Sequence, residues 1–241
     1  MTPPDSIQVQ HALPSDVPPL KENDPAVTQA IARHVAQWFG PVEATMEEAK
    51  SIYFPLLRHM CLPNNRLDCV TLVTSGISTL PMNVPAGTDA PRLVEFIQHL
   101  PKYWRPPTPA EHETSKLAWL AKNYPLSQMT MVSRMPAMFG TFFAPGHTIS
   151  DSPKPDPFAP GVDFCAWYVR IPRSIPKEAM SVGEGKGTIT LLELVPIYQE
   201  ELALIKKKGS KEIDKRWKRF DPTMMYDPKR PNFGTKKLGL F

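Results

Sequence analysis

The stretch TLVTSGISTLPMNVP, residues 71–85, joins a buried strand to a polar bend. Leu72 and Val73, together with the preceding Val70, have the apolar and β-branched character of a buried strand. Gly76 is expected to end that strand, because a glycine after such a run commonly marks a bend or bulge. The hydroxyl groups that follow can bond local backbone groups, and the prolines favour an extended loop. The stretch therefore predicts a strand, a polar bend and a fixed loop.

Apolar spacing and capping signals divide the rest of the chain into strands and helices. Asp24 before Pro25 predicts the start of a helix, and Thr108 with Glu111 forms a capping-box pattern. A helix is also predicted from Pro91, because four apolar residues follow at helical spacing. This mixture predicts an α+β fold in which helices pack on a mixed β-sheet. The expected helices span residues 24–40, 91–101, 108–123, 197–208 and 210–220, and the expected strands span residues 51–60, 67–74, 139–143, 162–171 and 188–194.

Charge divides the chain into a mildly acidic body and a basic end. The net charge is +4, but residues 206–241 hold twelve Lys or Arg against four Asp or Glu, so the remainder carries −4. The first 23 residues are rich in proline and have no apolar period. We therefore expect a flexible N-terminal arm over residues 1–23, one domain over residues 24–220, and a basic irregular tail over residues 221–241.

Composition also bears on location. The N-terminus lacks the basic start and apolar run of a secretory signal, and no stretch approaches the ~20 apolar residues of a membrane span. Cys61, Cys69 and Cys165 lie in apolar contexts, which favours reduced cysteines in the core. These features predict a cytoplasmic protein that does not bind membranes.

Catalysis has one candidate arrangement at the bend. A serine-dependent hydrolase would use Ser75 or Ser78 as nucleophile, His147 as base and Glu95 to orient it. The bend lacks the G-x-S-x-G elbow that presents such a serine. The six histidines and three cysteines form no H-x-x-x-H or C-x-x-C pair. We therefore expect no enzyme activity, no metal and no cofactor, and keep the hydrolase as an alternative.

Three other segments leave alternatives open. The methionines of residues 126–138 either fill gaps in the core or form a flexible binding surface. The basic residues 206–219 fit either a solvated helix or a nucleic-acid-binding regulator, although no nucleic-acid-binding motif accompanies the charge. Glu193 and Glu201 are candidates for pairing with arginines.

Several motifs resemble the Suppressor of fused family. The pattern TLVTSGIS-x-x-PMNVP is followed by R-L-x-E-F-I-x-x-L-P-x-x-W over residues 92–104. Ile77 stands where the family usually has methionine, which is a like-for-like apolar change. The segments PGHT (145–148), DFCAWYV (163–169) and LLELVPIYQEEL (191–202) follow in the family's order, so the resemblance runs from about residue 51 to residue 217.

The resemblance implies a single Suppressor-of-fused-like domain that binds proteins and catalyses nothing. Animal members restrain a transcription factor in Hedgehog signalling and hold an extended peptide in a cleft between two domains. This chain is similar to the N-terminal domain alone, so that two-domain clamp is not implied. Single-domain bacterial members are associated with toxin systems and are thought to act as immunity proteins. The resemblance therefore favours an immunity-type protein that binds and neutralises a partner toxin.

The positions that match the family's motifs are candidate contacts with that partner. An immunity surface should vary with its toxin, however, so the proline-rich loop over residues 151–160 is an alternative surface. An acidic body would suit a basic toxin. The candidate partner-binding residues are Thr74, Ser75, Gly76, Ser78, Asn83, Arg92 and His147.

Overall fold

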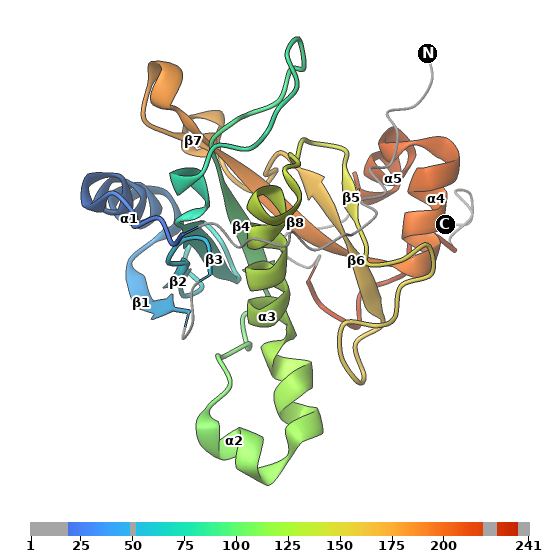
Figure 1. The fold of residues 1–241 in the computed structure, drawn as a ribbon. Coiled ribbons are helices and arrows are strands. Elements are labelled where there is room, and N and C mark those ends of the chain that lie inside the picture. Colours follow the sequence, from blue (N-terminus) through green and yellow to red (C-terminus); the bar gives the residue numbers. More distant parts are fainter. Residues whose placement is uncertain (1–18, 49–51, 219–225, 236–241) are drawn as a thin grey trace.

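The computed structural model describes residues 19–48, 52–218 and 226–235, in which one mixed sheet has helices packed on it (Figure 1). The helices are α1 (Pro25–Phe39), α2 (Pro109–Thr114), α3 (Lys116–Phe139), α4 (Gln199–Lys208) and α5 (Ser210–Trp217). The strands are β1 (Val42–Glu47), β2 (Leu57–Cys61), β3 (Val70–Ser75), β4 (Val94–Leu100), β5 (Thr148–Ile149), β6 (Phe164–Arg170), β7 (Ser181–Val182) and β8 (Ile189–Tyr198).

The sheet has the strand order β1-β2-β3-β4-β8-β6-β5, and β7 pairs with β8 outside this path. All of these pairs are antiparallel except β4 with β8. A parallel pair needs a long crossover, and here the connection contains α2, α3, β5 and β6. The predicted α+β class and mixed sheet are confirmed.

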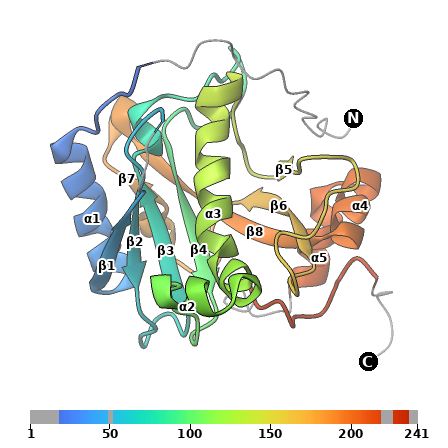
Figure 2. The ribbon, with the colours of Figure 1, turned by 60° about the horizontal axis from the view of Figure 1, so that its bottom comes forward.

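Helix α1 covers one face of the sheet and helix α3 covers the other. Neighbouring side chains on a strand point to opposite faces, so one strand contacts both helices. On one face, Ile31 and Val35 of α1 pack with Val73 of β3. On the other face, α3 lies across the strands (Figure 2), and Met129 packs with Leu72, which neighbours Val73 on β3. Each fully buried side chain of this kind contributes about 1.5–3 kcal/mol. The contacts on this second face position α3 over the sheet.

The helix predicted from Pro91 is wrong, because residues 94–100 form the central strand β4. The apolar residues of this segment match helical spacing, but all seven residues of the strand are buried. Central strands covered on both faces read as nearly continuous apolar runs, so spacing alone misleads. The polar residues Glu95 and His99 are accommodated by hydrogen bonds inside the protein.

The residues that cap helices were predicted more reliably than whether a segment is a helix or a strand. Asp24 caps α1 by accepting from the backbone N–H of Ala26, and Thr108 with Glu111 forms the predicted capping box. The helix expected over residues 108–123 instead divides at Ser115, where α3 begins and continues to Phe139. The short strand expected over residues 139–143 is wrong. Strand β1 was not predicted.

Residues 226–235 have no helix or strand, yet they pack into the body. Arg230 is buried, and its guanidinium makes two hydrogen bonds of 2.7 Å to the carboxylate of Glu201. Tyr226 is fully buried as well. A second buried pair joins Arg170 to Glu193. The expectation that Glu193 and Glu201 pair with arginines is confirmed.

Residues near the N-terminus also contact the body. The backbone N–H of Lys21 donates to the carbonyl oxygen of Tyr53, and the side-chain amide of Asn23 donates to that of Pro55. Most of the expected arm, residues 1–18, lies outside the described residues. The predicted domain limits at residues 24 and 220 stay predictions. Within the described ranges, no helix has both the length and the apolar content needed to cross a lipid bilayer.

Candidate functional site

The carboxylate of Glu95 holds the bend that follows β3. Glu95 is fully buried, and its oxygens accept hydrogen bonds of 2.7 Å from the hydroxyl groups of Thr74 and Ser78. They also accept from the backbone N–H groups of Gly76 and Ser78, both at 3.0 Å, and of Ile77 at 3.4 Å. Five donors from one short turn therefore converge on a single side chain.

The same bend requires a glycine. Gly76 has a φ of 131°, which L side chains rarely adopt. A Cβ added at this position would also overlap the carbonyl oxygen of Pro55. Gly76 therefore serves the close approach of two chain segments.

Burial raises the pKa of Glu95, and the hydrogen bonds from Thr74, Ser78 and Gly76 oppose that rise. No cation forms a salt bridge with Glu95 in the part of the chain that the structure describes. The carboxylate differs in this respect from Glu201, which Arg230 neutralises. The bend is thus held by hydrogen bonds rather than by an ion pair.

The candidate contact residues occupy very different environments. Thr74 and Ser75 are fully buried, so in this structure they present nothing to a partner. Gly76 is buried and Ser78 is half-buried, with its hydroxyl on Glu95.

The other three candidates reach solvent. Asn83 and Arg92 are exposed, and the amide of Asn83 donates to the carbonyl oxygen of Gly140 at the end of α3. His147 is half-buried just before β5.

The hydrolase arrangement is not assembled. Strands β4, β8 and β6 separate β3, which ends at Ser75 and precedes Ser78, from β5, which follows His147. The Ser78 hydroxyl donates to Glu95, and the ring nitrogen of His147 accepts from the backbone of Ala144. Burial lowers the pKa of His147. Ser75 is fully buried, and its hydroxyl makes no hydrogen bond to His147 or to any other group of the described residues. Ser78 and His147 engage different partners.

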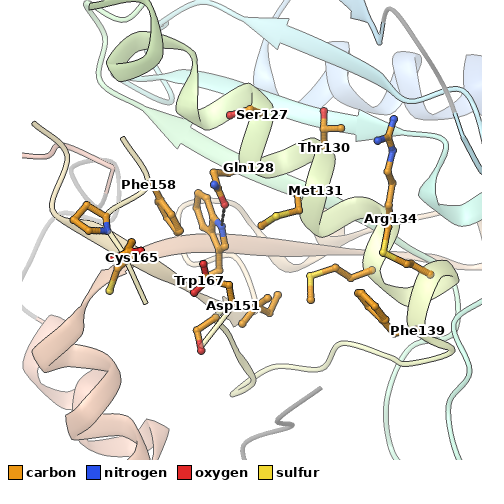
Figure 3. Close-up of a pocket in the computed structure, with 16 residues that line it drawn as sticks. Ser127, Gln128, Thr130, Met131, Arg134, Phe139, Asp151, Phe158, Cys165 and Trp167 are labelled. Carbon is orange, nitrogen blue, oxygen red and sulfur yellow. Dashed lines mark hydrogen bonds between the residues drawn. The ribbon is translucent and has the colours of Figure 1, made fainter. Parts of the chain in front are cut away.

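An apolar groove of about 620 Å³ lies between α3 and the loop that joins β5 to β6 (Figure 3). Helix α3 forms one wall of the groove, and Trp167 of β6 lies at its base. The side chains that line it are mostly methionine, aromatic or small polar residues. They include Gln128, Met131, Met135, Met138, Phe139, Ile149, Phe158 and Trp167.

The base of the groove is rigid and its wall is adaptable. Trp167 stacks on Phe158 with ring centroids 4.9 Å apart, and its indole N–H donates to the side-chain oxygen of Gln128 at 3.4 Å. Met131 is 45 % exposed and points into the groove from α3. Methionine side chains are flexible and polarisable, so they repack around different apolar groups. This combination suits the binding of an apolar surface.

Charges mark the rim of the groove. Asp151 and Asp156 line it from the β5–β6 loop, and both are exposed. Arg134 lines it from α3 and is paired with Glu48. Cys165 also lines the groove, and burial raises the pKa of its thiol to about 11, which keeps it protonated at neutral pH. The free charge facing the groove from the loop is therefore negative.

Part of this groove was visible in the sequence. The methionine-rich segment and the proline-rich loop were both expected as possible surfaces, and the structure brings them together. Met129 and Met135 are buried and fill the core, whereas Met131 is exposed, so a binding role for the methionines stays a prediction. The contributions of Ile149 and Trp167 were missed, because they come from strands that the sequence does not place beside α3.

Two other chemistries can be checked against the structure. Among the described residues, no three His, Cys, Asp or Glu side chains gather as metal ligands. The basic segment forms the end of α4 and the whole of α5, where Ile213 and Trp217 are buried and the lysines are exposed. The helix therefore packs by its apolar edge.

The fold is an α+β domain with a mixed sheet whose strands β3, β4 and β6 are buried, a bend held by a carboxylate, and a surface groove beside α3. The family described as "Suppressor of fused protein (SUFU)" matches residues 55–231. The chain therefore belongs to the Suppressor of fused family. That family is known as a non-catalytic binding and regulatory domain. A comparison with curated proteins finds no significant match.

Solved structures share the fold at low sequence identity. A protein described as a Suppressor of fused homologue from Neisseria gonorrhoeae FA 1090 aligns with a TM-score of 0.60 and 13% identity, covering 87% of this chain and 98% of that one. A chain of the Sufu-Fu complex aligns with a TM-score of 0.55 and 11% identity, over 81% of this chain and 85% of that chain. Drosophila Suppressor of Fused gives the same TM-score and identity, over 89% of this chain and 53% of its own. This chain thus spans about half the length of the Drosophila protein.

Proposed function

We propose that this chain is a non-catalytic protein-binding module that binds a protein partner in the groove beside α3. The observation that carries the proposal is the groove itself, with a rigid aromatic base and the exposed side chain of Met131 on its α3 wall. Exposed apolar surface of this kind commonly marks a site of protein interaction. A related chain of this fold was solved in a complex, the Sufu-Fu complex, which supports protein binding as the role.

The particular role that we propose is that of an immunity-type protein in the cytoplasm of a bacterium, which neutralises a partner toxin by covering it. The acidic residues Asp151 and Asp156 on the groove rim favour a partner with basic residues at its contact surface. Asn83, Arg92 and His147 are candidate contacts outside the groove. The four candidates at the bend, from Thr74 to Ser78, are proposed to hold the fold rather than the partner.

The test is capture of partners from the native cell lysate with the tagged full chain. The wild type, Met131→Asp and Leu117→Asp would be compared under the same washes. Leu117 is a matched control, because it lies on α3, is 63% exposed and does not line the groove. We expect one stoichiometric partner with the wild type and with Leu117→Asp, and its loss with Met131→Asp.

Co-expression then tests the immunity role. Cells that produce the captured partner should survive when the wild-type chain is present and die when Met131→Asp replaces it. Equal capture by Met131→Asp would remove the groove from the proposal. Toxicity that the wild-type chain does not reduce, or a partner that is not toxic, would overturn the immunity role.

The hydrolase and nucleic-acid alternatives have less support. Ser75 is fully buried, Ser78 donates to Glu95, and the basic residues of the sequence accompany no known nucleic-acid-binding motif. Turnover lost in Ser78→Ala with the fold intact would revive the first alternative. Binding to DNA or RNA that falls steeply with added salt would revive the second.

A further inference from the structure

We propose that the groove beside α3 accepts an amphipathic helix of about three turns that carries basic residues along one flank. This inference rests on the proposed function, because it names the part of the partner that enters the groove. It follows from the spacing of the α3 side chains, the length of the wall, the shortness of the neighbouring strand and the charge of the rim.

The spacing of the groove-lining residues on α3 fits a helix–helix contact. Gln128, Met131, Met135 and Met138 line the groove at intervals of three, four and three residues. This is the spacing of a seam along which a second helix packs at a shallow angle. Side chains of the second helix would pack on Met131, which is 45 % exposed, in the groove that the buried side chains of Met135 and Trp167 also line.

The length of the wall sets the length of the occupant. Groove-lining residues of α3 run from Ser127 to Phe139, which at about 1.5 Å per residue is roughly 18 Å, or three helical turns. An apolar residue at every third or fourth position would then place three or four side chains in the groove.

A partner in an extended conformation would find a smaller binding surface here than a helix would. The strand at this edge of the sheet, β5, consists of Thr148 and Ile149 alone and already pairs with Tyr168 and Trp167 of β6. An added strand would therefore find a platform of two residues. The wall formed by α3 is several times longer, so the larger contact is with a helix.

The negative charge on the rim of the groove determines which side of the bound helix should carry basic residues. Asp151 faces the groove from the side opposite α3 (Figure 3), and Asp156 lines the groove from the same loop. Neither is among the residues paired in salt bridges in the described ranges. On the α3 side, Arg134 is already paired with Glu48. A helix lying between them would be most stable with Lys or Arg toward the loop and neutral residues toward Arg134.

The test is selection of random 16-residue peptides on the full chain, followed by binding measurements on the enriched peptides. We expect enriched sequences with apolar residues at positions i, i+3 or i+4 and i+7, and with Lys or Arg on one flank. Fluorescence anisotropy should show at least about tenfold weaker binding to Met131→Asp and no change with Leu117→Asp. A double variant, Asp151→Lys with Asp156→Lys, should weaken basic peptides and favour peptides in which Glu replaces Lys.

A proline at the centre of an enriched peptide separates the two modes of binding. Proline breaks a helix, so the inference predicts at least about tenfold weaker binding for the substituted peptide. Enrichment of sequences that alternate every second residue or tolerate proline would overturn the inference, as would equal binding to Met131→Asp or no enrichment at all. A second copy of the chain is the remaining occupant, and a dimer that Met131→Asp dissociates in sedimentation would also overturn it.

These experiments distinguish a failure of the helix inference from a failure of the proposed function. If the native partner is captured in a way that depends on Met131 but the selected peptides are extended, the inference fails and the protein-binding role stands. If the native partner is captured equally by Met131→Asp, the groove fails as the binding site whatever peptides it selects.

Discussion

In the bend after β3, five donors surround the carboxylate of Glu95, whereas in the groove beside α3 the side chains of Met131 and Asp156 are exposed. The bend contains the sequence motifs that first indicate the family. Its polar groups are nonetheless largely satisfied inside the protein, so they stabilise the fold. Most of the side chains that line the groove lie outside those motifs, although Cys165 and Trp167 belong to the motif DFCAWYV. The bend motif and the binding surface are thus proposed to lie in different parts of the molecule.

The largest effect should come from removing the centre of the bend. Glu95→Ala leaves three buried backbone N–H groups and two hydroxyls without their acceptor, and each unsatisfied buried group costs about 1–3 kcal/mol. We expect a loss of about 5 kcal/mol in the free energy of unfolding, measured by urea denaturation. A loss below about 1 kcal/mol would show that the bend does not depend on Glu95.

A slightly smaller loss should follow from Arg230→Ala. This change leaves the carboxylate of Glu201 buried without its cation, which typically costs about 3–5 kcal/mol. Lys229→Ala is the control variant. It removes the neighbouring positive charge, which forms no salt bridge in the described ranges. If both variants unfold at the wild-type urea concentration, the packing of residues 226–235 does not contribute to stability.

The pH dependence of stability tests how the bend carries its charge. Burial raises the pKa of Glu95 in the folded state above the value of about 4.3 expected when the chain is unfolded. Between these two values the folded state binds more protons than the unfolded state, so the contribution of Glu95 is full below about pH 4.3 and decreases as the pH rises through the folded pKa.

Glu95→Gln removes this titration and provides the reference. The difference in the free energy of unfolding between wild type and Glu95→Gln should therefore decline as the pH rises from 4 to 8. A difference that grows with pH would show that the five donors outweigh burial and hold the carboxylate ionised.

The smallest effect on stability is expected in the groove. Met131→Asp places a charge on a side chain that is already 45 % exposed, so the free energy of unfolding should change by less than about 1 kcal/mol. Thermal unfolding followed by circular dichroism measures this change. A larger loss would mean that Met131 stabilises the core. Reduced partner capture by Met131→Asp could then result from unfolding and would not locate the binding surface.

The sequence predicted local features better than long-range ones. The caps at Asp24 and Thr108 and the bend at Gly76 all depend on residue types whose chemistry is nearly unambiguous. Strand β4 was mistaken for a helix, because burial on both faces removes the alternation that distinguishes a strand. Element type therefore depended on packing that no single segment reveals.

The groove could be predicted only in parts. The methionines of α3 and the proline-rich loop each drew attention in the sequence, but Trp167 and Ile149 join them only through the strand order β8-β6-β5. In the same way, Arg230 reaches Glu201 across 29 residues of chain from a segment without helix or strand. Such contacts depend on topology, which apolar spacing does not encode.

The most direct measurement compares Ser78→Ala with Met131→Asp for partner capture and for unfolding in the same preparations. Ser78→Ala removes one hydrogen bond to Glu95 and should lower the free energy of unfolding by about 1 kcal/mol while the partner is retained. Met131→Asp should leave the unfolding free energy nearly unchanged and abolish capture. Loss of the partner in Ser78→Ala together with full capture by Met131→Asp would contradict the account and place the binding surface at the bend.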